Sequence, residues 1–321
     1  MGSTGGGVFE GKAALVTGAG RGIGREEAML LAAEGASVVV NDLGGASDGA
    51  GNDVGPAQSV VDEIIAAGGA AVANTSNIAT WDGAEALVAQ AVETFGRLDV
   101  VVNNAGILRD RLSFNMTEEE FDQVLAVHLK GHFGVARHAA AHWKALNKAT
   151  GEPAGGSIVN TASESGLYGN AGQANYAAAK AGIAAMTLVM ARECERIGVR
   201  VNAIAPVART RLTEAVAGDY MKPDESGFDR FGPENVAAVA CWLASDLADG
   251  ISGQVLQVQG GQIQLLEGWR PLTQVTDTVA WTLDSVGGRR EELFSKSDGS
   301  VPAFFFGPPD DSRQPYPPMA M

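Results

Sequence analysis

The chain has 321 residues, of which 45% are hydrophobic and 19% are charged, the balance of a globular protein with a large core. Its formal net charge of −15 at pH 7 argues against nucleic acid or an anionic membrane surface as a partner. Two cysteines are too few for a disulfide framework or a metal cluster, and without an apolar run of membrane length or a signal peptide we expect a cytoplasmic protein with no bound metal.

Short apolar runs alternate with helical patterns along most of the chain. Residues 13–16 and 38–40 are typical of strands buried on both faces, and an amphipathic helix lies between them. We expect further helices at 60–67, 84–95, from about 117, at 176–197 and at 233–245, and further strands at 70–74, 98–103, 157–161, 200–204 and 254–258. This alternation predicts an α/β fold with a doubly wound parallel sheet of about seven strands, a Rossmann fold, and helices on both faces.

The stretch TGAGRGIG, from Thr17 to Gly24, joins the first strand to the first helix. Glycines let the backbone approach a pyrophosphate, and the helix N-terminus supplies amide groups and positive charge. The stretch therefore predicts a dinucleotide site. The alternative is a glycine-rich turn that binds nothing.

Asp42 follows the second strand, 18 residues after Gly24. A carboxylate at this position can accept hydrogen bonds from both ribose hydroxyls of an adenosine and would repel a 2′-phosphate. It favours NAD over NADP. The alternative is an ordinary aspartate in a turn.

The run NYAAAK places Tyr176 and Lys180 four residues apart, and therefore on one face of the predicted helix. The alanines between them favour the helix and let another surface approach its backbone closely. On these residues alone, the pair is either a functional phenol and ammonium or a solvated pair on a surface helix.

Other signals concern the loops and the end of the chain. Thr117-x-x-Glu120 is a capping box that begins the long helix, and residues 213–231 form a loop long enough to be a lid. We expect the sheet to end at Gly261, which divides the chain into a catalytic domain of residues 1–262 and an extension of residues 263–321. Apolar residues recur at helical spacing in the extension before a Pro-rich end, at Leu272, Val275, Val279, Leu283 and Val286. We expect the extension to pack on the same domain or on a partner subunit.

The glycine loop, the run NNAG at residues 103–106, and Ser163 thirteen residues before Tyr176 together resemble the short-chain dehydrogenase/reductase family. The resemblance covers roughly residues 9–261. The stretches VVVNDLGG, VVNNAGILRDR, VHLKG and GLYGNAGQANYAAAK are similar to its multifunctional-enzyme type 2 group. Members of that group oxidise (3R)-hydroxyacyl-CoA esters with NAD, and bacterial relatives act in fatty-acid or steroid side-chain breakdown.

The resemblance implies a catalytic role for three residues. Tyr176 would take the hydroxyl proton of a secondary alcohol as the hydride leaves for NAD, and Ser163 would hydrogen-bond the same oxygen. Lys180 and the positive nicotinamide ring would both favour the phenolate and so lower a pKa that is ordinarily about 10. The alternative for Ser163 is a serine that only caps a turn.

The resemblance also implies the cofactor contacts. They are Gly18, Arg21, Gly22, Ile23, Gly24, Asp42, Asn77, Ile78, Asn104, Ala105, Gly106, Tyr176, Lys180, Pro206, Ala208 and Thr210. The family usually has glycine after that proline, and Val207 stands there instead, so the sequence leaves the conformation of this loop open.

Substrate contacts are expected on loops at the carboxyl edge of the sheet. Besides Ser163, the candidates are Leu108, Leu167 and Tyr168, each of which could equally be ordinary packing. Two neighbouring arginines, Arg109 and Arg111, could meet CoA phosphates or carboxylates at an interface.

His128 occupies a position where most of the family has asparagine, which holds a water that links the lysine to solvent. It shares a helical stripe with Phe121, Leu125 and His132, so we expect it to face inward. Three alternatives stay open. The ring could carry protons, the backbone carbonyl could order the water, or His128 could be a hydrogen-bonded core residue.

The leading hypothesis is an NAD-dependent dehydrogenase of a (3R)-hydroxyacyl-CoA or a 17β-hydroxysteroid. One alternative is a 3-oxoacyl-acyl carrier protein reductase, which usually takes NADPH and is therefore disfavoured by Asp42. Another is a non-catalytic NAD(H)-binding protein. The resemblance further implies a homodimer or dimer of dimers that pairs through the long helix from Thr117 and the helix of Tyr176.

Overall fold

In the computed structural model the described residues are 6–297, apart from 47, 50, 52, 214–220, 224–226 and 270. The chain divides into two compact units, the first ending at Leu265 and the second beginning at Leu266. No helix among the described residues is long and apolar enough to cross a membrane.

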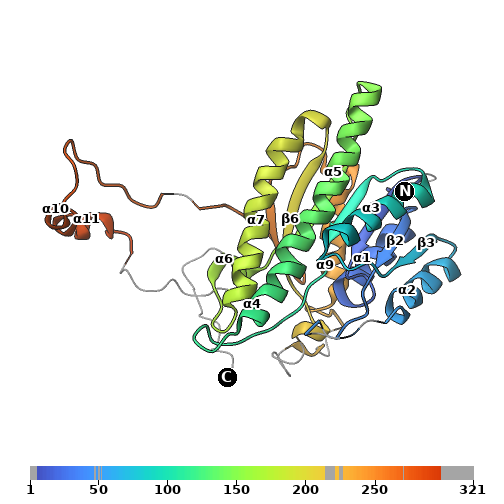
Figure 1. Ribbon diagram of the computed structural model, residues 1–321, viewed down its shortest axis with the longest axis horizontal. Helices are drawn as coiled ribbons and strands as arrows, with labels where there is room; N and C mark the ends of the chain where they lie inside the picture. Colours follow the sequence, from blue (N-terminus) through green and yellow to red (C-terminus); the bar gives the residue numbers. More distant parts are fainter. Residues whose placement is uncertain are drawn as a thin grey trace. The chain divides into compact units, whose positions relative to one another are not determined.

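The first unit is built on one eight-stranded sheet, with the strand order β3-β2-β1-β4-β5-β6-β7-β8 (Figure 1). The strands are β1 (Ala13–Thr17), β2 (Ser37–Asn41), β3 (Ala70–Asn74), β4 (Val100–Asn103), β5 (Ser157–Thr161), β6 (Arg200–Val207), β7 (Val255–Gln259) and β8 (Gln262–Leu266). Every neighbouring pair from β3 to β7 is parallel. The order reverses between β1 and β4, as in a doubly wound sheet, so the predicted fold is confirmed.

Helices cover both faces of this sheet. They are α1 (Gly22–Ala33), α2 (Gly55–Ala66), α3 (Trp81–Phe95), α4 (Glu118–Leu125), α5 (Gly131–Thr150), α6 (Glu164–Tyr168), α7 (Ala174–Cys194) and α9 (Pro233–Ala244). Residues of α1, α2 and α9 form one apolar core with one face of the sheet, and residues of α3, α5 and α7 form the core on the other face (Figure 1). Alternate strand residues supply the two cores: Val16 of β1 belongs to the first and Leu15 to the second.

The long helix from Thr117 is interrupted by one wide turn. The predicted capping box is present, because Thr117 and Glu120 each accept a hydrogen bond from the other's backbone amide. Between α4 and α5, residues 126–130 form a π-helix, in which the amide of Gly131 donates to the carbonyl of Ala126. The extra residue breaks the 3.6-residue period on which the predicted stripe depends.

The prediction of an inward-facing stripe is therefore wrong for Phe121 and confirmed for His128 and His132. Phe121 is 38% exposed, and Val124 takes the buried position in its place. His128 and His132 are both buried, as expected.

The expectation that the sheet ends at Gly261 is wrong. After a two-residue connection, Gly260–Gly261, the chain forms β8 and places an eighth strand at the edge. Ile263 and Leu265 alternate with polar or half-buried neighbours and are 56% and 70% exposed. The strand was missed because it is short and lies at the edge, with no continuous apolar run.

In the second unit the apolar spacing from Leu272 gives less helix than it suggests. The described residues contain only α10 (Leu283–Gly288) and α11 (Arg290–Leu293). Helix α10 begins at a capping box on Thr282, and the threonine- and valine-rich stretch before it has low helix propensity. Residues 298–321, with the Pro-rich end, lie outside the described residues, and the packing of the extension stays a prediction.

One ionisable side chain lies in the core beneath α1. Glu27 is fully buried, and neither carboxylate oxygen finds a hydrogen-bond partner among the described residues. Burial raises the pKa of Glu27 to about 8, so the folded protein holds this side chain as a neutral acid at pH 7.

This burial makes stability depend on pH. The unfolded chain releases the proton near pH 4.5 and the folded chain only near pH 8, so the free energy of unfolding should fall as pH rises between these values. The Glu27→Gln substitution should remove this loss of stability, a gain on the order of 3 kcal/mol at pH 8 relative to pH 5. Thermal unfolding at both pH values measures it, with the exposed Glu93→Gln as the control. An equal change in Tm at both pH values would contradict the assignment.

Candidate active site

The predicted site residues gather at the carboxyl ends of β1, β2, β4 and β5, the edge where doubly wound sheets bind their ligands. The glycine loop follows β1. Gly18 and Gly22 have positive φ angles of 64° and 55°, and a Cβ on Gly18 would lie 2.7 Å from the Cα of Ala105. Helix α1 begins at Gly22, after Arg21, with no side-chain cap on its first amides. The loop thus fits a pyrophosphate.

Asp42 lies beside this loop. Its two carboxylate oxygens accept hydrogen bonds from the amides of Gly20, at 2.9 Å, and Gly44, at 2.7 Å. A carboxylate offers about four acceptor positions, so two remain for ribose hydroxyls. The carboxylate is held in place by the backbone before any ligand binds.

The run after β4 is tied to the end of β1. Thr17 Oγ1 accepts from the amides of Asn104, at 3.0 Å, and Ala105, at 3.1 Å. The side-chain amide of Asn104 in turn donates to the carbonyls of Thr17 and Gly18, both at 3.1 Å. Asn104 therefore fixes the two loops that frame the cofactor site.

Gly106 is a glycine for another reason. A Cβ at this position would lie 2.4 Å from Cε1 of the His128 ring. No side chain fits there without displacing the histidine. The sequence assigned Gly106 to the cofactor alone. In the structure, the absence of a side chain at this position leaves the space that the His128 ring occupies.

The remaining predicted cofactor positions surround the same edge. Asn77 is exposed, while Ile78 is buried in the core beneath α3. Strand β6 runs through Pro206 to Val207, and no described non-glycine residue has positive φ, so valine replaces the family's glycine within an ordinary strand. Ile23, Ala105 and Ala208 pack on the cores, and the methyl group of Thr210 faces Gly22.

Ser163, Tyr176 and Lys180 come together from β5 and α7. Ser163 caps α6, its Oγ accepting from the amide of Ser165 at 3.2 Å. The ammonium nitrogen of Lys180 lies 5.5 Å from the centre of the Tyr176 ring and donates to the carbonyl of Thr161 at 2.6 Å. Lys180 is only 2% exposed, so the reading of a solvated surface pair is wrong.

Burial shifts the pKa values of both ionisable side chains of this trio, Tyr176 and Lys180. Burial raises the pKa of Tyr176 to about 12, opposed by its interaction with the Ser163 hydroxyl and reinforced by Glu164 and Asp110. Burial lowers the pKa of Lys180 to about 7. In the chain alone, Tyr176 is a neutral phenol at neutral pH and Lys180 is close to half ionised, so phenolate formation needs further positive charge.

His128 packs against both the phenol and the loop after β4. Its ring stands edge-on to Tyr176, with centroids 5.1 Å apart, and its Nε2 lies 3.0 Å from the amide and 2.8 Å from the carbonyl of Ile107. Burial, with repulsion from Lys180, lowers the pKa of His128 to about 3. The ring is neutral over the physiological range.

The candidate substrate residues lie at the same edge. Leu108 is half-buried in the loop after β4. Leu167 and Tyr168 are half-buried in α6, not in a loop as expected, because the Ser163 cap starts a short helix there. Arg111 forms an ion pair with Glu120 of the capping box at 2.7 Å, so its carboxylate partner lies within this chain.

Sequence reasoning missed Asn175, which is fully buried at the start of α7. Its Oδ1 accepts from the amide of Tyr176 at 2.7 Å, and its Nδ2 donates to the carbonyls of Arg109, at 3.0 Å, and Glu120, at 2.9 Å. Asn175 thus fixes the start of α7, which carries Tyr176 and Lys180, to the loop after β4. The only signal was an asparagine in the first turn of a predicted helix.

The predicted lid, residues 213–231, is described at residues 213, 221–223 and 227–231. Residues 214–220 and 224–226 lie outside the described residues. Arg209, which precedes the segment, pairs with Asp229 and donates to the carbonyl of Met221 at 2.7 Å, so both residues of the segment are held to the chain that follows β6.

Comparisons with known proteins agree with this geometry. The model of the short chain dehydrogenase family matches residues 12–220. Hydroxyacyl-CoA dehydrogenase ChsB1 of Mycobacterium tuberculosis is 46% identical over 309 residues, 90% of this chain and 93% of that protein. Peroxisomal multifunctional enzyme type 2 of Mus musculus is 40% identical over 92% of this chain and 38% of its own length.

Two further comparisons concern the fold and the alternative function as a 3-oxoacyl-acyl carrier protein reductase. The crystal structure of a short chain dehydrogenase from Mycobacterium avium superposes with a TM-score of 0.82 at 51% identity, covering 93% of this chain and 99% of that one. The 3-oxoacyl-[acyl-carrier-protein] reductase FabG of Staphylococcus aureus is 40% identical over 78% of this chain and 97% of its own length. The resemblance inferred from the motifs is confirmed.

Proposed function

The chain belongs to the short-chain dehydrogenase family, and on that premise we propose that it oxidises a (3R)-hydroxyacyl-CoA with NAD. One observation carries the proposal: Tyr176, Ser163 and the buried Lys180 converge beside a glycine loop and a carboxylate shaped for a dinucleotide. The name of one relative, a hydroxyacyl-CoA dehydrogenase that is 46% identical, supports this class of substrate.

In the proposed mechanism, Ser163 positions the substrate oxygen and Tyr176 removes its proton. When bound, oxidised NAD would accept the hydride and add a positive charge near the phenol. Lys180 stabilises the phenolate from beneath the ring, at a centroid distance of 5.5 Å. Asn175 holds the helix that carries both residues, so the phenol and the ammonium keep this geometry during turnover.

The second candidate is a 3-oxoacyl-acyl carrier protein reductase. The similarity to FabG over nearly its whole length favours it. Asp42 argues against it, because its carboxylate would meet the 2′-phosphate of NADPH. The intact catalytic trio argues against a non-catalytic NAD(H)-binding protein.

Substitution of Tyr176 tests the mechanism. Absorbance at 340 nm, with fatty-acyl and steroid side-chain (3R)-hydroxyacyl-CoA esters and free 17β-hydroxysteroids as the panel, should identify the substrate. Tyr176→Phe should lose about 100-fold or more in turnover because the general base is removed, while NAD binding changes little. Near-normal turnover of Tyr176→Phe would remove the mechanism, and an inactive wild type over the whole panel would remove the proposed substrate.

Substitution of Asp42 tests the preference for NAD. A carboxylate near a phosphate dianion costs a few kcal/mol, so kcat/KM should be roughly 100-fold higher with NAD than with NADP. Asp42→Ala should narrow this ratio mainly by improving NADP, and the exposed Asp62→Ala should leave it unchanged. Equal efficiency with the two cofactors in the wild type would refute the assignment.

We further propose that the His128 ring, not only its backbone, contributes to proton transfer near Lys180. Its Nδ1 is buried and has no partner among the described residues, and the ring touches Tyr176. His128→Leu should then lower turnover several-fold and change its pH profile, with NAD binding and Tm near normal. His128→Asn, the usual family residue, should retain more activity. A loss of activity that follows a loss of stability would make His128 a packing residue.

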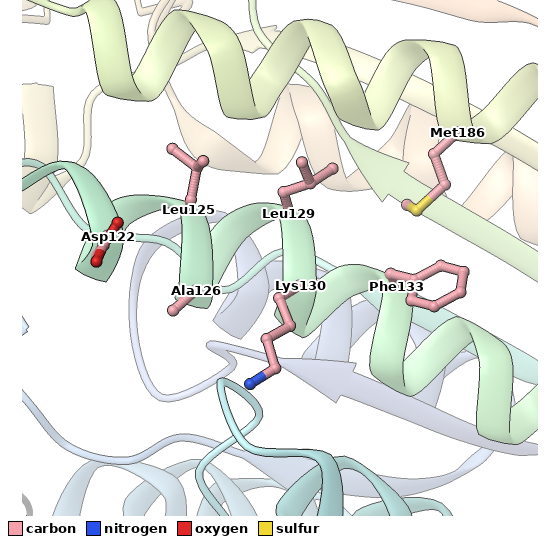
Figure 2. A pocket seen from close by; sticks show the side chains of 7 residues that line it. All are labelled: Asp122, Leu125, Ala126, Leu129, Lys130, Phe133 and Met186. Carbon is pink, nitrogen blue, oxygen red and sulfur yellow. The ribbon is translucent and has the colours of Figure 1, made fainter.

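An apolar hollow on the outer surface of α4, the π-turn, α5 and α7 supports the expected homodimer (Figure 2). It is lined by Asp122, Leu125, Ala126, Leu129, Lys130, Phe133 and Met186. Figure 2 shows Leu125 and Leu129 directed toward α7, the helix that carries Met186. We propose that a second copy of the chain covers this surface.

Light scattering at micromolar concentration should show at least a dimer. Phe133, which is 41% exposed in the hollow, should be buried by the partner, so Phe133→Glu should shift the protein toward monomer. Phe114, which is 80% exposed in the loop before Thr117, gives the control variant Phe114→Glu. A monomeric wild type would contradict the proposal.

A further inference from the structure

Two arginines lie close together beside the glycine loop, although they come from distant parts of the chain. Arg21 immediately precedes α1, and Arg211 follows Thr210, whose methyl group faces Gly22. Burial lowers the pKa of Arg211 from its usual value, and repulsion from the positive charge of Arg21 adds to this effect. The two guanidinium groups are therefore near enough to repel each other.

Arg211 joins two loops that follow distant strands of the sheet. Its Nη1 donates to the carbonyl of Gly45, in the loop after β2, at 3.0 Å. In the sheet, β2 and β6 are separated by β1, β4 and β5. Because the glycine loop follows β1, the chain that follows β6 must cross the predicted dinucleotide site to reach Gly45.

No carboxylate neutralises this pair of arginines. Neither Arg21 nor Arg211 forms an ion pair with any residue that the structure describes. Asp42 and Asp48 lie near enough to oppose the lowering of the Arg211 pKa, but the oxygens of Asp42 already accept hydrogen bonds from two backbone amides. In a protein with a net charge of −15, two converging arginines without an ion-pair partner indicate a place for an anion.

The start of α1 favours an anion at the same place. This helix has 12 residues, its first amides have no side-chain cap, and its first turn contains no acidic residue. Free amides and the helix dipole attract negative charge at such a terminus. A guanidinium adds two parallel N–H groups that match the oxygens of a phosphate.

We propose that Arg211 is a cofactor-binding residue and that, together with Arg21, it holds the pyrophosphate of the dinucleotide at the start of α1. The contacts expected from the sequence include Arg21 and Thr210 but not Arg211. A pyrophosphate has two negative charges, which the two guanidinium groups would balance. The inference rests on the proposed function, since it concerns the cofactor of the proposed reaction.

Binding measurements without a substrate test the proposal. Arg211→Ala should weaken the binding of ADP-ribose about tenfold or more, the scale of a lost hydrogen bond between charged groups. Its affinity for adenosine, which has the ribose expected at Asp42 but no phosphate, should stay within about twofold of the wild type. Isothermal titration calorimetry measures both affinities.

Two further variants complete the test. Arg211→Lys keeps the charge but not the planar pair of N–H groups, so it should lose less affinity for ADP-ribose than Arg211→Ala. Arg196, which is exposed in the turn after α7, gives the control variant Arg196→Ala, whose affinities for both ligands should equal those of the wild type.

Two results with Arg211→Ala would overturn the proposal. One is an unchanged affinity for ADP-ribose. If 2′-phospho-ADP-ribose alone were weakened, Arg211 would belong to the 2′-phosphate of NADP instead. The other is an equal loss for ADP-ribose and adenosine, which would mean that Arg211 only shapes the loop after Asp42.

Failure of the proposed function gives a different result. A wild-type chain that binds ADP-ribose through Arg211 but oxidises no compound of the panel loses its proposed substrate and keeps its phosphate ligand. A wild-type chain that binds neither ADP-ribose nor NADH refutes both.

Discussion

The burial of the Lys180 ammonium is the constraint on which the rest of the site depends. A charge taken almost wholly out of water must be given acceptors by the protein, or it loses its proton. The structure supplies the carbonyl of Thr161 directly, and His128 and His132 of the long helix lie close enough for the charge of Lys180 to lower their pKa values. The same burial places the ammonium nitrogen 5.5 Å from the centre of the Tyr176 ring.

The loops that frame the cofactor site are joined to this buried cluster. His128 bonds the backbone of Ile107 and leaves room for nothing larger than glycine at position 106. Asn104 in turn fixes that loop to the glycine turn after β1. The residues that prepare the phenol and those that frame the dinucleotide site are thus parts of one hydrogen-bonded framework, so a change in one loop is transmitted to the other.

Most of the fold could be predicted from the sequence, because its strands, its helices and the glycine loop each have a signal in a short stretch of residues. Strands β1 and β2 are buried on both faces and contain the apolar runs that predicted them, and the predicted bounds of β3 and β5 agree with the observed ones. The catalytic trio and the glycine loop are short motifs with fixed spacing, and the structure brings them to one edge. What could not be predicted depends on tertiary contacts: the edge strand β8 and the partner atoms of Asn175. The π-turn was also not predicted, because the helical pattern in the sequence was searched with a constant period of 3.6 residues per turn.

The π-turn at residues 126–130 lets the long helix present side chains to two different surfaces. Successive residues of an α-helix are separated by about 100°, so a single inserted residue rotates everything after it by more than a quarter of a circle relative to everything before it. Residues 126–130 therefore act as an angular offset between α4 and α5. The offset lets the inward-facing histidines meet the sheet, while Leu125, Leu129 and Phe133 meet the outer hollow. Deletion of one residue there would restore a uniform helix and misalign the two surfaces.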